Sequence, residues 1–241
     1  MQQNDGEYFQ RAQCIRLFLE YLKQPYEECL YGKCDTQKWF EGKHSMGFEF
    51  PNLPYYIDGD FKLTETVAIL RYIADQHGML GSNAKERAVI SMLESAAVEM
   101  RANAAKVAYS KQPVCAVHFG YILILNFLIQ EEEKEQVLKN LPRTLGYWSS
   151  FLKNKAFLMG SNPIHVDFML YESLEVLRYL DHTCLDSFEN LQQFQKRIEQ
   201  LPQISAYMNS SRFIKWPLHS WFAGFGGGDA PPAGHPANKS L

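Results

Sequence analysis

The feature that most constrains the fold is a long stretch of helical periodicity in the middle of the chain. Between Ala84 and Tyr109, apolar residues recur every three or four positions, at Val89, Leu93, Ala96, Met100, Ala104 and Val107. This spacing places them on one face of a single helix, which must bury that face against other elements. Apolar residues at similar spacing within 170–177 and 191–201 predict further helices. The chain after residue 81 is therefore expected to be all-helical.

The first third of the chain is mixed. Periodicity predicts helices over 12–23 and 64–77, and a short strand over 27–31. Between them, 32–47 is expected to be a loop, and two apolar runs flank Asp58-Gly59-Asp60, a typical hairpin turn. Gly78 and Gly81 end the second helix, so a domain boundary is expected there. We divide the chain into an α/β domain over 1–81, a helical domain over 82–225 and an extended or disordered tail over 226–241.

Composition excludes several functional classes. The 241 residues include 24 basic and 27 acidic side chains, giving a net charge of -3, whereas nucleic-acid binders usually carry a basic excess. The five cysteines are odd in number, scattered and without a C-x-x-C pair, which argues against a metal cluster and favours a reducing compartment. The first residues carry Asp5, Glu7 and Arg11 and are not typical of a secretory signal. A cytoplasmic protein without bound metal or nucleic acid is expected.

Several ordered stretches resemble a known family. They are Trp39-Phe-Glu-Gly-Lys43, the segment 47–59 that contains Asn52-Leu-Pro54, Ala68-Ile-Leu-Arg-Tyr-Ile-Ala-Asp75, Asp167-Phe-Met-Leu-Tyr171 and Phe213-Ile-Lys-Trp-Pro217. Together they closely resemble mu-class glutathione transferases, especially those of flatworms. The resemblance implies a thioredoxin-like N-terminal domain, an all-helical C-terminal domain and a cytosolic homodimer. It also implies detoxification by conjugation of reduced glutathione to small hydrophobic electrophiles, with glutathione as co-substrate and no cofactor.

The resemblance also assigns the ends of glutathione to residues. Trp39 and Lys43 match the positions that hold the glycine carboxylate, through an indole N–H and a cation. Leu53 matches the strand end that pairs with the cysteine backbone, and the Leu53–Pro54 bond is expected to be cis. Asn52 precedes it in the same motif.

The γ-glutamyl end is assigned to the start of the second predicted helix. Thr66 lies where free N–H groups bind anions readily. Glu65 replaces the usual Gln of the mu class and offers a partner for the γ-glutamyl ammonium. Tyr109 matches the position that reaches the electrophile.

The amino terminus departs from the family. The family begins with an apolar strand and a Tyr whose hydroxyl donates to the thiolate, but an ungapped count places Asp5 and Gly6 there. A shorter loop makes Tyr8 the candidate donor; the alternative is a terminal aromatic without this role. Because residues 1–7 are polar, the first strand is expected to be missing and the domain partly open. An alternative function follows: a glutathione- or apolar-ligand-binding protein whose turnover is impaired.

A second departure is the block from Gln112 to Gln130, which holds no charged side chain. Three interpretations remain open: a membrane span, an aggregation-prone strand, or translated intron sequence. Polar residues interrupt the run and it splits a helical domain, which argues against a span. The intron hypothesis is favoured because it also explains the altered start. The acidic run 131–135 is then expected to begin a helix.

A smaller departure lies before Asp167. The family has Ser or Thr at the position of Ile164, as a helix cap with Asp three residues later. Ile164 has no side-chain acceptor, and losing such a cap typically costs about 1 kcal/mol.

Overall fold

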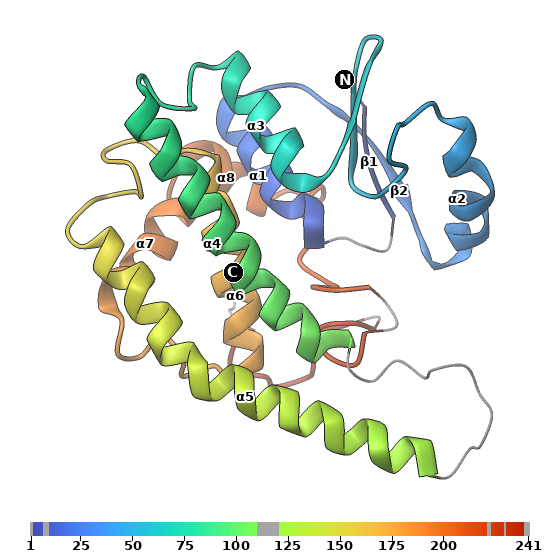
Figure 1. Ribbon diagram of the computed structural model, residues 1–241, viewed down its shortest axis with the longest axis vertical. Helices are drawn as coiled ribbons and strands as arrows, with labels where there is room; N and C mark the ends of the chain where they lie inside the picture. The colour runs from blue at the N-terminus through green and yellow to red at the C-terminus, as the bar shows by residue number, and fades with distance from the viewer. Residues whose placement is uncertain (1, 7–9, 110–120, 221–222, 229, 239–241) are drawn as a thin grey trace.

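The computed structural model describes residues 2–6, 10–109, 121–220, 223–228 and 230–238. Within these residues a small sheet with its helices forms one region, and long helices form the other (Figure 1). This is the expected arrangement of a thioredoxin-like N-terminal domain and a helical C-terminal domain.

The N-terminal region contains a four-stranded sheet in the order β2-β1-β3-β4. β1 runs parallel to β2 and antiparallel to β3, and β3 and β4 form the predicted hairpin. The strands span β1 Gln2–Gly6, β2 Glu27–Tyr31, β3 Tyr55–Asp58 and β4 Phe61–Thr64, and the α-helices span α1 Gln10–Leu22, α2 Thr36–Gly42 and α3 Thr66–Gln76. Two short 3-10 turns, η1 Lys33–Asp35 and η2 Lys43–Ser45, flank α2, so the expected loop over 32–47 is largely helical.

The prediction that the first strand is missing was wrong. β1 lies between β2 and β3, with Asn4 opposite both Cys29 and Tyr55. Strand pairing uses backbone N–H and C=O groups, which polar residues supply as well as apolar ones do. A prediction based on apolar side chains therefore missed a strand whose ladder is made by the main chain.

The described residues of the C-terminal region form five helices: α4 Ala84–Tyr109, α5 Tyr121–Leu152, α6 His165–Leu180, α7 Glu189–Glu199 and α8 Pro202–Met208. α6 packs against α1, α4 and α7, and 13 of its 16 residues are buried. α1 packs against both α3 and α6, which joins the sheet region to the helical region (Figure 1). Across the same junction, Arg71 of α3 and His165 of α6 both bind the buried Glu94 of α4, at 2.7 and 2.6 Å.

The bounds of α4 match the sequence prediction, but its buried face is slightly rotated. Leu93, Met100, Ala104 and Val107 are buried as expected, whereas Ala96 is exposed and Ala97 is buried instead. The neighbouring alanines have equal hydropathy, so the sequence pattern could not distinguish them.

The charge-free block over 112–130 lies partly outside the described residues. From Tyr121 onward it forms the start of α5, so the strand interpretation is wrong for residues 121–130. Because α5 already begins at Tyr121, the acidic run 131–135 lies inside the helix and does not begin it. Among the described residues, no helix combines the length and apolar character needed to cross a membrane. The intron hypothesis stays a prediction.

The N-terminus of α6 is stabilised by Asp167 rather than by a side chain at the N-cap position. Ile164 makes no side-chain cap, as expected. The Asp167 carboxylate instead accepts the N–H of Ile164 and the N–H of Leu158, both at 2.8 Å. One buried carboxylate therefore satisfies two backbone donors from different segments.

The described part of the tail packs onto α6. The expectation of an extended or disordered tail did not include these contacts. Ala237 is buried, and the Tyr179 hydroxyl donates to Asn238 Oδ1 at 2.9 Å. The His235 ring stacks on Tyr179 with a centroid distance of 5.2 Å.

Candidate functional site

The loop before β3 carries the first part of the site. The Leu53–Pro54 peptide bond is cis, which confirms the expectation. The N–H of Leu53 donates to Asn52 Oδ1 at 2.9 Å, and Asn52 Nδ2 donates to Glu65 Oε1 at 3.0 Å. Asn52 thus ties this loop to the residue that precedes α3.

Glu65 holds an unusual backbone conformation immediately before α3. Its φ is 71° and its ψ is 117°, a region that costs a non-glycine residue about 1–3 kcal/mol. Its side chain does not cap the helix, because it is paired with Asn52. Strain of this kind is found where the chain positions a functional group. Glu65 and the first residues of α3, where the helix dipole carries a partial positive charge, line the neighbouring cavity.

That cavity, which we call the site cavity, has a volume of about 230 Å³. Glu65 and Thr66 line it from the sheet region, and Arg101 and Tyr109 line it from α4. The Tyr109 hydroxyl lies 3.0 Å from Ser220 Oγ and accepts the Ser220 N–H at 3.1 Å. The structure therefore brings the predicted γ-glutamyl residues and the predicted electrophile residue to one space between the two regions.

Trp39 lies in α2, and Lys43 directly follows that helix. Trp39 is 5% exposed and belongs to a small buried cluster with Phe48, Leu53 and Tyr55. Lys43 begins η2, and its ammonium lies 5.2 Å from the centroid of the Phe40 ring. Trp39 is therefore packed with Leu53, whereas neither Trp39 nor Lys43 is among the residues that line the site cavity.

Tyr8, the candidate thiolate donor, lies outside the described residues. Asp5 and Gly6, the ungapped alternatives for that position, are paired in β1 with Leu30 and Tyr31 of β2. The catalytic position therefore stays a prediction.

Sequence reasoning missed Arg101, the one strong charge that α4 contributes to the site cavity. Arg101 Nη1 lies 2.6 Å from Glu172 Oε2, on α6. Burial by itself lowers the pKa of Arg101, but the Glu172 carboxylate raises it, and the net pKa lies above its usual value. Arg101, Ala105 and Tyr109 are four residues apart, so helical spacing from Tyr109 was the signal that would have found Arg101.

The buried Cys14 lies at the same wall of the cavity. Burial, and then the Glu172 carboxylate, raise the pKa of its thiol well above the usual value. The thiol therefore stays protonated at neutral pH, and Cys14 is a packing residue rather than a nucleophile.

Comparisons with known proteins identify the family. The family model described as "Glutathione S-transferase, N-terminal domain" matches residues 7–75, and "Glutathione S-transferase, C-terminal domain" matches residues 122–211. A class-mu 26 kDa glutathione S-transferase of Fasciola hepatica (isozyme 7) is 53% identical over 92% of this chain and 94% of its own length. The chain belongs to the class-mu glutathione S-transferases. The class-mu 26 kDa isozyme of Schistosoma japonicum is 48% identical over the same shares of the two chains.

Solved structures agree with this class-mu assignment at the level of the fold. Glutathione S-transferase Blo t 8 is 27% identical and superposes with a TM-score of 0.79, over 94% of this chain and 100% of its own. The Pi-class glutathione S-transferase of Onchocerca volvulus is 25% identical, with a TM-score of 0.69 over 86% and 90% of the two chains. Six of the seven predicted binding residues fall within the N-terminal family match, and Tyr109 lies between the two matches.

Proposed function

We propose that this class-mu chain conjugates reduced glutathione to small hydrophobic electrophiles. The observation that carries the proposal is the junction at the site cavity. There the Asn52–Glu65 hydrogen bond links the cis Leu53–Pro54 loop to the start of α3, and Tyr109 lines the same cavity from α4.

In this proposal the start of α3 receives the γ-glutamyl carboxylate. The helix dipole and the N–H groups of its first turn favour an anion there, with the Thr66 hydroxyl beside them. The Glu65 carboxylate pairs with the γ-glutamyl ammonium. Trp39 and Lys43 hold the glycine carboxylate at the opposite end of the tripeptide.

The cysteine of glutathione then lies beside Leu53. The main-chain N–H of Leu53 is already paired with Asn52 Oδ1. The bound peptide therefore either uses the Leu53 carbonyl or displaces the hydrogen bond between Leu53 and Asn52. The free thiol titrates near pH ~8.5, so the protein must favour the thiolate. The thiolate attacks the electrophile on the Tyr109 side, forming a C–S bond while the leaving group departs or the double bond takes up a proton. No cofactor takes part, because glutathione is the co-substrate.

The first test measures turnover of a chromogenic aryl halide while glutathione is varied. Thr66→Val removes one hydrogen bond to a charged group, about 1.5–3 kcal/mol, and should raise KM for glutathione about tenfold or more while KM for the electrophile stays constant. The control is Thr183→Val, an exposed threonine after α6. An unchanged KM for glutathione in Thr66→Val contradicts the proposed placement.

Tyr8→Phe tests the thiolate donor. If Tyr8 donates to the sulfur, kcat falls and the pKa of bound glutathione, read from thiolate absorbance against pH, rises in the variant. Unchanged values show that another group acts. Wild-type binding to glutathione resin without any turnover would replace the enzyme proposal with the impaired-binding alternative.

We also propose that the chain is a cytoplasmic homodimer. Phe50 is 77% exposed, and Met92 and Tyr147, 54% and 69% exposed, line a second hollow of about 280 Å³ between α4 and α5. Large exposed apolar groups of this kind mark association surfaces. Phe50→Ser should increase the fraction of monomer in sedimentation velocity over a dilution series, whereas Phe61→Ser, also on the sheet region, should not. Equal monomer fractions in the two variants contradict the role of Phe50.

A further inference from the structure

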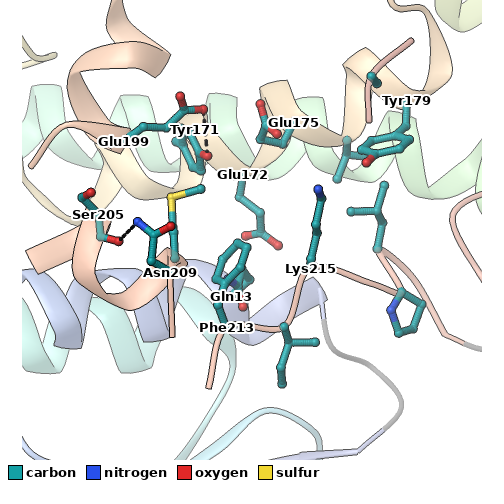
Figure 2. Close-up of a pocket in the computed structure, with 16 residues that line it drawn as sticks. Gln13, Tyr171, Glu172, Glu175, Tyr179, Glu199, Ser205, Asn209, Phe213 and Lys215 are labelled. Carbon is teal, nitrogen blue, oxygen red and sulfur yellow. Dashed lines mark hydrogen bonds between the residues drawn. The ribbon is translucent and has the colours of Figure 1, made fainter. Parts of the chain in front are cut away.

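A partly open cavity lies between α6 and the C-terminal segment (Figure 2). We call it the tail cavity; its volume is about 160 Å³. Its lining combines apolar and aromatic side chains, such as Tyr171, Tyr179, Met208 and Phe213, with charged ones, namely Glu172, Glu175, Glu199 and Lys215. The proposed glutathione chemistry makes no use of it.

The two cavities are separate. They share no lining residue, and α6 stands between them: Glu172 lines the tail cavity, whereas the next residue, Ser173, lines the site cavity. Arg101, the ion-pair partner of Glu172, is on the site-cavity side.

One end of the tail cavity is polar and incompletely paired. The Nε2 of Gln13 is buried and has no acceptor among the described residues, while its Oε1 accepts Arg16 Nη1 at 3.0 Å. Arg101 holds Glu172 Oε2, and the Cys14 thiol hydrogen-bonds to the same carboxylate, but Oε1 accepts from no N–H or O–H donor in the described part of the chain. Arg101 Nη2 is likewise buried without an acceptor there. Figure 2 shows the Glu172 carboxylate pointing into the cavity toward Gln13 and Phe213.

These two groups are complementary in kind. Gln13 Nε2 offers a donor and Glu172 Oε1 offers an acceptor, at the same end of the tail cavity. Buried polar atoms are nearly always paired in folded proteins, so a pair left open calls for an explanation. A ligand hydroxyl satisfies both at once, because it donates one hydrogen and accepts another.

The size and cover of the cavity define the rest of the ligand. An apolar cavity of about 150 Å³ accommodates one benzene ring. Ala237 in the tail forms part of the lining, and the tail is held over α6 by the hydrogen bond between Tyr179 and Asn238. The tail therefore forms part of the wall that a bound ligand would contact.

We propose that the tail cavity binds a monocyclic phenol, whose hydroxyl donates to Glu172 Oε1 and accepts from Gln13 Nε2 while its ring packs among the aromatic side chains. This is a binding site of its own, outside the glutathione cleft.

The test uses the full chain with ¹³C-labelled methionine methyl groups. Met208 lines the tail cavity and Met169 lines the site cavity, so their two signals report the two spaces separately. Titration with phenol should shift Met208 in a saturable manner and leave Met169 unchanged. Anisole, which accepts a hydrogen bond but donates none, should bind at least tenfold more weakly than phenol. A saturable shift at Met169 alone, or no shift at Met208, overturns the proposal.

Variants locate the polar contact. Gln13→Leu keeps the volume but removes the donor. It should reduce the affinities for phenol and for anisole by similar factors, about tenfold, because the oxygen of both ligands accepts from Gln13 Nε2. Gln193→Leu, an exposed glutamine on α7, is the matched control and should bind phenol like the wild type. If Gln13→Leu does not fold, the wild-type comparison of phenol with anisole decides alone. Equal affinities for the two ligands in the wild type overturn the assignment of the hydroxyl.

Discussion

β1 and α6 each occupy an inner position in their region, but β1 has a polar sequence and α6 a largely buried, apolar one. β1 reads Gln-Gln-Asn-Asp-Gly and yet is an inner strand of the sheet, paired on both sides. α6 is the innermost helix and buries 13 of its 16 residues. The comparison shows that an inner position can be secured in two ways: by backbone pairing, which is insensitive to side-chain type, or by side-chain burial, which depends on it.

α6 also buries charged groups, and each of those is tied to another element. His165 binds Glu94 of α4, Glu172 binds Arg101 of α4, and Asp167 accepts two backbone N–H groups. We therefore expect substitutions at the charged residues of α6 to be far more damaging than substitutions in β1. The predictions below test this difference, in order of expected effect.

Asp167→Ala should have the largest effect. It leaves the N–H groups of Ile164 and Leu158 buried without an acceptor, at about 1–3 kcal/mol each, so unfolding free energy should fall by about 2–6 kcal/mol. Urea denaturation measures it. The matched control is Asp181→Ala, whose carboxylate accepts the N–H and hydroxyl of Thr183 in an exposed turn. Similar losses of unfolding free energy in the two variants would show that burial of the hydrogen bonds at the start of α6 does not increase their contribution to stability.

The pH dependence of the unfolding free energy gives a second test of the buried Asp167. Burial raises the pKa of Asp167 to about 7, although the two N–H donors and Lys155 hold it lower than burial alone would. Because the folded pKa exceeds the ordinary value of 3.8, the folded state binds this proton more tightly than the unfolded state does. The stability of the wild type relative to Asp167→Asn should therefore decrease from about pH 4 to about pH 7 and stay level above that. A constant difference across this range contradicts the raised pKa.

Replacing polar residues of β1 should have the smallest effect, and it should be stabilising. Gln3→Val and Asn4→Val each replace a polar residue of the strand by a strong strand former, and β-propensities span about 1 kcal/mol. The better of the two should raise Tm by about 2–4 °C, the shift expected for 1 kcal/mol in a chain of this size. Glu27→Val, at an exposed position of the edge strand β2, is the control. No gain at either β1 position would show that the polar strand suits its surroundings.

Much of the site could be predicted because its residues are close together in sequence-defined motifs. Asn52, Leu53, Glu65 and Thr66 flank one hairpin, and hairpin geometry returns the second group to the first. Helical spacing from Tyr109 places Arg101 on the same face of α4, but no local pattern shows that Glu172 of α6 would face it, so the ion pair could not be predicted. Lys43 remains a prediction, since its described contact is with Phe40 of the preceding helix.

The sequence by itself determined the elements that depend on side-chain periodicity and local turns: α4 with its bounds, the hairpin around Gly59, and the order of mixed and helical regions. Only the tertiary structure decided that polar residues 2–6 form an inner strand, that α5 already begins at Tyr121, and that the tail lines a cavity on α6. The physical reason is the separation along the chain between the residues that interact. Periodicity and turn chemistry act between near neighbours, whereas strand pairing and cavity walls arise between segments whose contact no local pattern encodes.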